Sequence, residues 1–217
     1  NNPPSVYVGV IGDDSINKEE IISMICAEKY EDDNYKRNSF FDSCFLKVIH
    51  KAHLYFLYNS EASDFLIHHG LEEIDYLKNV SKMYENLIKE FCSTLIYVTY
   101  HINFSQMLYL KELSSFCERN GKKLFVIHFI QNINTHEGLE HKISQCITEA
   151  FSVEKVPLHP LNTSQVHYKG VHQFFYRQSE LVFHYILAKD AQQAEFYNPL
   201  ALLNIKNSLI TNRNLKI

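Results

Sequence analysis

Ser5-Val-Tyr-Val-Gly-Val-Ile11 runs directly into Gly12-Asp-Asp-Ser-Ile-Asn-Lys-Glu19, and this junction decides the fold. The first stretch is apolar, rich in valine, and ends at a glycine, which predicts a buried strand entering a turn. Residues 17–30 then repeat apolar side chains at helical spacing, with Glu19 and Glu20 in the first turn, where acids suit the helix dipole. The junction therefore predicts a strand, a loop and a helix in succession.

The same alternation of strands and helices continues along the chain. We expect further strands at 45–50, 53–58, 94–100, 123–129, 165–168, 171–177 and 182–188, and helices at 71–92, 104–119, 135–150 and from Pro199 to 210. Strands that are nearly all apolar and alternate with helices indicate a mostly parallel sheet covered on both faces. The close pair 45–50 and 53–58 adds an antiparallel edge strand. We predict one three-layer α/β domain over 1–217, with a divergent C-terminal hairpin and helix at about 160–217.

Composition excludes several classes of protein. The 217 residues include 21 Lys and Arg against 25 Asp and Glu, a net charge of −4, so we expect no nucleic-acid partner. No apolar run reaches 18 residues, and the amino terminus lacks the basic and apolar regions of a signal peptide, so we expect no membrane insertion and a cytoplasmic location. The five cysteines lie far apart and form no C-x-x-C pair, which predicts reduced, buried thiols.

The loop after the first strand carries a resemblance. Phosphate-binding loops read G-x-x-x-x-G-K-[ST] between a strand and a helix, and Gly12 and Lys18 stand at the first-glycine and lysine positions with the correct spacing. Together with the antiparallel strand pair and the alternation that follows, this opening resembles the small GTPase-like P-loop domains up to about Ala150. The resemblance implies a P-loop GTPase-like sheet with its ligand site at this loop.

The chain departs from that family at each of its motifs. Asn17 replaces the second glycine, Glu19 replaces the hydroxyl that coordinates Mg²⁺, and Asp13 and Asp14 add carboxylates to a loop that should offer bare N–H groups. The later family motifs are altered too, as three short stretches show. They are Asn59-Ser-Glu-Ala62 in place of D-x-x-G, His128-Phe-Ile-Gln131 in place of N-K-x-D, and a faint S-A-K at Ala188-Lys189. We therefore expect a pseudoGTPase that is not an enzyme and holds no cofactor, with Gly12–Glu19 as a vestigial loop.

Other readings remain open at this point. A divergent GTP-binding protein or weak GTPase using Lys18 is the main alternative, while an enzyme on a flavodoxin-like sheet lacks a motif such as G-x-S-x-G. Asp13, Asp14 and Glu19 could form a cation site, although a solvated loop tip is the simpler interpretation, and no histidine pair has metal-ligand spacing.

Aromatic residues near the C-terminal hairpin suggest what the domain does instead. Tyr168, Phe174, Phe175 and Tyr176 form either a protein–protein interface or a hairpin packed over the sheet edge. We expect an interaction or scaffold module with protein partners, and a cytoskeletal or other large assembly is one candidate setting.

Overall fold

The structure is a computed structural model that describes residues 5–13, 15–26, 44–49, 52–58, 71–100, 102–131, 138, 141, 146–158, 174–189 and 191–210. The chain divides into two compact units, and each is described by itself. The first unit is Asn1–Val98 with Ser208–Ile217, and the second is Thr99–Asn207.

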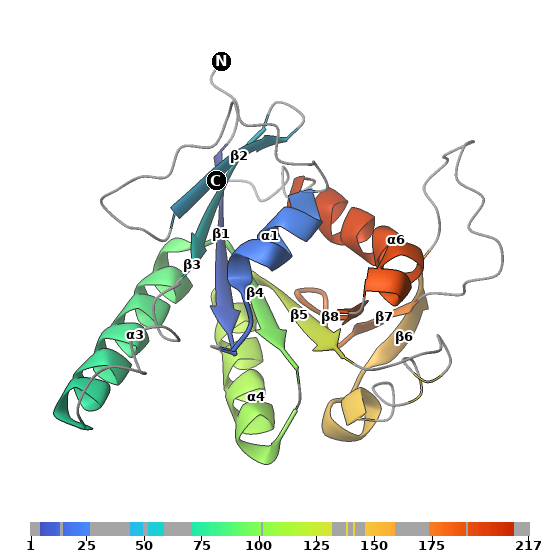
Figure 1. Ribbon diagram of the computed structural model, residues 1–217. Coiled ribbons are helices and arrows are strands. Elements are labelled where there is room, and N and C mark those ends of the chain that lie inside the picture. Colours follow the sequence, from blue (N-terminus) through green and yellow to red (C-terminus); the bar gives the residue numbers. More distant parts are fainter. Residues whose placement is uncertain are drawn as a thin grey trace. The chain divides into compact units, whose positions relative to one another are not determined.

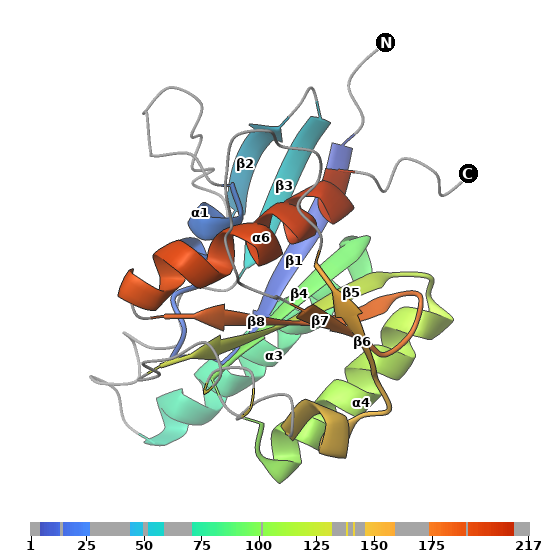
Figure 2. The same cartoon turned by 90° about the vertical axis from the view of Figure 1, so that its right-hand side faces the viewer.

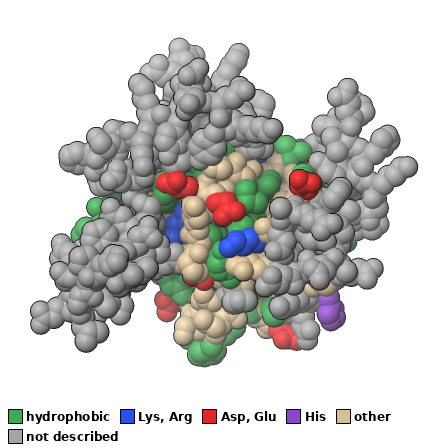
Figure 3. Space-filling view, viewed as in Figure 1, with side chains coloured by type: hydrophobic (Ala, Val, Ile, Leu, Met, Phe, Trp, Pro, Cys, Tyr) green, Lys and Arg blue, Asp and Glu red, His purple; other side chains and the backbone are tan. Residues whose placement is uncertain are grey.

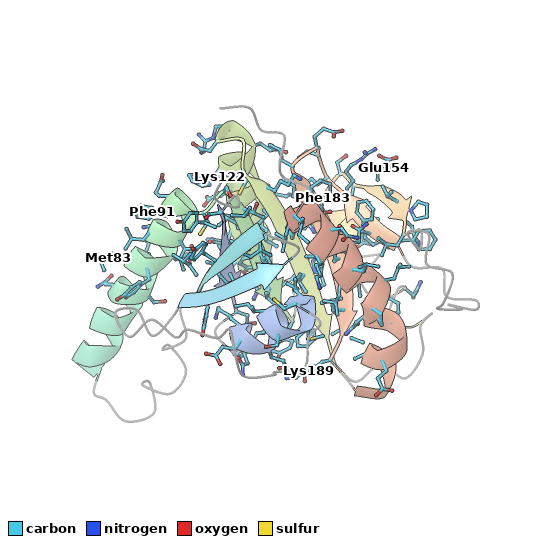
Figure 4. The ribbon with its side chains drawn as sticks, turned by 90° about the horizontal axis from the view of Figure 1, so that it is seen from above. Met83, Phe91, Lys122, Glu154, Phe183 and Lys189 are labelled. Carbon is cyan, nitrogen blue, oxygen red and sulfur yellow. The ribbon has the colours of Figure 1, made fainter. Side chains whose placement is uncertain are left out.

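The first unit is built on parallel strands with one antiparallel strand at the edge. Its strands lie in the order β2 (Cys44–Ile49), β3 (Ala52–Tyr58), β1 (Ser5–Gly12) and β4 (Thr94–Thr99). The pairs of β1 with β3 and β4 are parallel, whereas β2 runs antiparallel to β3. Helices α1 (Lys18–Cys26) and α3 (Leu71–Phe91) lie on opposite faces of these strands (Figures 1 and 4).

Continuous apolar runs explain why these strands are buried on both faces. Val8 and Val10 are both 0% exposed, and every residue of β4 is buried. Gly9 brings α3 close to β1, because a Cβ at this position would lie 2.3 Å from Cγ2 of Ile88 and 2.8 Å from a methyl group of Leu95. The glycine in the middle of the first strand is therefore required by helix packing.

The second unit holds the remaining strands, in the order β5 (Lys123–Ile130), β8 (Val182–Ala188), β7 (Phe174–Arg177) and β6 (Glu154–Pro157). Strand β5 is parallel to β8, and β7 is antiparallel to both β8 and β6. Helix α4 (Phe104–Arg119) and the part of α6 (Ala191–Ile210) that belongs to this unit lie on opposite faces of β5 and β8 (Figure 2). The prediction of an α/β chain with mostly parallel strands and an antiparallel edge is confirmed.

The sequence predicts the ends of most helices and strands to within one or two residues of those in the structure. The clear exceptions lie in the last third of the chain. Strand β6 was not predicted, and it pairs with β7; the strand predicted at 165–168 lies outside the described residues. The prediction that Pro199 opens the last helix is wrong, because α6 begins at Ala191 and Pro199 lies inside it. The helix is anchored next to this proline by Asn198, whose amide accepts from the Ala188 N–H and donates to the Ala188 carbonyl, both at 2.8 Å.

Candidate functional site

The loop predicted to matter begins at the carboxyl end of β1, between the ends of β3 and β4. Val10 lies opposite Tyr58 of β3, and Gly12 lies opposite Val98 of β4. In open parallel sheets this edge is where ligands bind, because the strand ends and helix N-termini converge there. The first unit thus presents Gly12–Glu19 at the position that the sequence predicted.

Gly12 sets the path of the loop. Its φ is +129°, and a Cβ there would lie 2.1 Å from the carbonyl oxygen of Val98. The backbone N–H of Asp13 donates to that same carbonyl at 2.9 Å. The loop therefore starts in contact with β4, in a conformation that favours glycine.

The carboxylate of Asp13 is turned back into its own loop. Its Oδ1 accepts from the backbone N–H of Ser15 at 3.1 Å and from the Ser15 hydroxyl at 2.7 Å. The Asp13 carbonyl accepts from the N–H of Ile16 at 3.1 Å. These bonds form an Asx turn, in which a side-chain oxygen accepts from the Ser15 N–H, a group that a phosphate would otherwise approach. Asp14 lies outside the described residues.

Asn17 caps the first helix. Its Oδ1 accepts from the backbone N–H groups of Glu19 at 3.0 Å and Glu20 at 3.3 Å, as an N-cap side chain does. Free N–H groups at such a terminus are the usual phosphate donors of a P-loop. Here an amide oxygen of the protein already occupies two of them.

Lys18 and Glu19 are also engaged by neighbours within the first unit. Lys18 is only 7% exposed, and its Nζ lies 3.5 Å from the Asp13 carbonyl, to which it donates. The Glu19 carboxylate accepts a short hydrogen bond from the hydroxyl of Tyr58, which is itself 2% exposed. The sequence analysis does not predict that Tyr58 belongs to this site. Its position at the end of β3, beside the loop, is the feature that could have indicated it.

The second unit has its own cluster at the carboxyl ends of β5 and β8. Lys189, labelled in Figure 4, donates from Nζ to the hydroxyl of Tyr100 at 2.7 Å and lies 4.9 Å from the centre of that ring. Tyr100 in turn stacks on Phe129 with the ring centres 5.9 Å apart. Gln131 follows β5 and is exposed. The faint S-A-K match thus ends in a lysine that binds a tyrosine hydroxyl, and Tyr100 was not foreseen.

The candidate interface residues divide between core and surface. Tyr176 is 1% exposed and belongs to the core of the second unit. Phe175 is half-buried and stacks on Tyr185 at 5.4 Å, while the ring of half-buried Phe174 lies 3.9 Å from Nζ of Lys155. Tyr168 lies outside the described residues. The interface assignment stays a prediction, and among the described residues it rests on Phe174 and Phe175.

A buried histidine pair links β5 to β8, and the sequence analysis did not single it out. Nε2 of His128 lies 3.1 Å from Nδ1 of His184, and Nε2 of His184 lies 3.0 Å from Oε1 of Gln178. Because a carbonyl oxygen only accepts, His184 must carry its proton on Nε2 and accept from His128 on Nδ1. Burial lowers the pKa of His184 to about 3, and burial together with the neighbouring His184 lowers the pKa of His128 well below its usual value. Both rings are therefore neutral at physiological pH.

Metal-ligand groupings and thiols add little to the site. Within the described part of the chain, no three His, Cys, Asp or Glu side chains lie close enough together to hold a metal ion. Cys26, Cys92 and Cys117 are buried as predicted, but Cys146 is exposed.

No protein-family model and no curated protein matches the chain. Among the described helices, none combines the length and the apolar character needed to cross a bilayer.

Proposed function

We propose that this chain is a degenerate GTPase-like P-loop domain that does not hydrolyse nucleotide and acts as a protein interaction or scaffold module. One observation carries the proposal: described polar groups of the loop Gly12–Glu19 are bonded to one another and to Tyr58. The cap from Asn17 takes helix N–H groups, Asp13 closes on Ser15, and Tyr58 binds the Glu19 carboxylate. Asp13, Asn17 and Glu19 thus bond to groups of the protein at the positions where a P-loop would bind phosphate and Mg²⁺.

Charge supports the same conclusion. Asp13 and Glu19 place carboxylates at the loop where a triphosphate would bring further negative charge. Two like charges 4 Å apart repel by about 4 kcal/mol at an effective dielectric near 20. Since each ~1.4 kcal/mol is tenfold in affinity, one such contact costs orders of magnitude. Lys18 alone does not offset this repulsion.

The residue at the guanine-binding position of the family also differs in this chain. Gln131 stands where the family has an aspartate that accepts from the guanine N–H groups, and an uncharged amide is a weaker, differently patterned partner. Lys189, at the S-A-K position, donates to Tyr100. Any remaining nucleotide affinity would therefore show little preference for guanine.

A domain of this kind has no ligand-driven switch, because it does not hold the γ-phosphate and Mg²⁺ that order the switch loops of a GTPase. Its remaining role is to bind other proteins through its surface. In the view of Figure 3, acidic and basic side chains are mixed with hydrophobic ones over the described residues. These residues form no broad basic area for nucleic acid in that view. We propose a cytoplasmic module, with Phe174 and Phe175 as the first interface candidates.

Restoring the P-loop tests the proposal. The double substitution Asn17→Gly and Glu19→Thr recreates G-x-x-x-x-G-K-T while leaving Lys18 in place. We expect the wild type to bind no fluorescent GTP analogue, and the double variant to bind it only when Mg²⁺ is present. Asn17→Gly with Glu19→Gln is the matched control, because it removes the charge without supplying a hydroxyl ligand for the metal.

Two results would contradict the proposal. Mg²⁺-dependent binding of the analogue by the wild type would favour the divergent GTP-binding alternative. Absence of binding by a folded variant that also carries Asp13→Ala would show that the loop is not a degraded P-loop. Glu19→Thr alone keeps the Asn17 cap, so it covers the case in which the double variant does not fold.

A further inference from the structure

We draw no further inference here: the strongest candidate, the exposed apolar patch of Met83, Leu87 and Phe91 on α3, carries nothing, because nothing among the described residues shows what covers it.

Discussion

Gly12 couples the loop Gly12–Glu19 to the strand beside it. Its backbone has a positive φ of +129° and lies against β4, so a side chain there meets both strain and a backbone atom that cannot move away. The neighbouring Asp13 N–H is held by the Val98 carbonyl. The close approach of β4 and the positive φ therefore require a glycine at this position.

Gly12→Ala should therefore lower the free energy of unfolding by about 2–5 kcal/mol, from overpacking and backbone strain together. Gly121→Ala is the matched control: its φ is +63°, but nothing lies within 4 Å of a Cβ there, so only the backbone cost of about 1 kcal/mol applies. Urea denaturation followed by circular dichroism measures both. Equal losses in the two variants would contradict the close approach to Val98.

Sequence analysis found the loop residues but not what they bind. Gly12, Asn17, Lys18 and Glu19 stand at motif positions that a single sequence displays. Tyr58, in contrast, meets Glu19 only because β1 and β3 pair in a particular register. That register depends on contacts between distant segments, which local patterns do not encode.

At the scale of the elements, β5 and β8 are joined by a neutral histidine pair as well as by their backbone. Folded His128 and His184 have lowered pKa values, whereas in the unfolded chain both have an ordinary value near 6.5. The unfolded state therefore binds more protons below that pH. The contribution of the pair to the free energy of unfolding is therefore complete above about pH 6.5 and is lost progressively as the pH falls toward 3.

His184→Gln tests this coupling between strands. Each buried histidine contributes a slope of about 1.4 kcal/mol per pH unit to the free energy of unfolding below its unfolded pKa. Between pH 6 and pH 4, the free energy of unfolding of the variant should fall less steeply than that of the wild type, by the slope of one histidine. The variant should nevertheless be less stable than the wild type at neutral pH. Identical slopes for His184→Gln and the wild type in urea titrations would disprove the buried neutral pair.

Strand β7 contains one buried ring, Tyr176, next to the half-buried rings of Phe174 and Phe175. Tyr176→Ala should cost about 3–5 kcal/mol of stability, because it deletes a buried ring. Phe174→Ser should cost much less, because its ring is only half-buried, and should weaken assembly with protein partners if this strand is the interface. Thermal denaturation and co-purification measure the two effects. A Phe174→Ser variant that unfolds like Tyr176→Ala would assign the whole strand to the core.

Elements with strong periodicity were predictable and short ones were not. Residues 104–119 were assigned in full, because the apolar spacing and the Asn120-Gly121 stop signal agree with the capping of α4. Strand β6 has four residues, with glutamate, lysine and proline among them, and it exists because β7 pairs with it. Pro199 is a misleading signal, because proline usually stands in the first turn of a helix, whereas here it lies inside α6.

For the whole molecule, we propose that the loop Gly12–Glu19, which resembles a P-loop, does not bind nucleotide. The net charge of −4 gives no general attraction for a triphosphate, so binding has to come from the loop itself. The described residues of the loop bond to one another and to Tyr58 instead. The domain should then behave identically with and without nucleotide.

Isothermal titration calorimetry of the wild-type chain with GTP and GDP in the presence of Mg²⁺ tests this claim most directly. We expect no binding heat up to about 1 mM ligand, which corresponds to an affinity weaker than about −4 kcal/mol. A Kd in the micromolar range for either nucleotide would contradict the account.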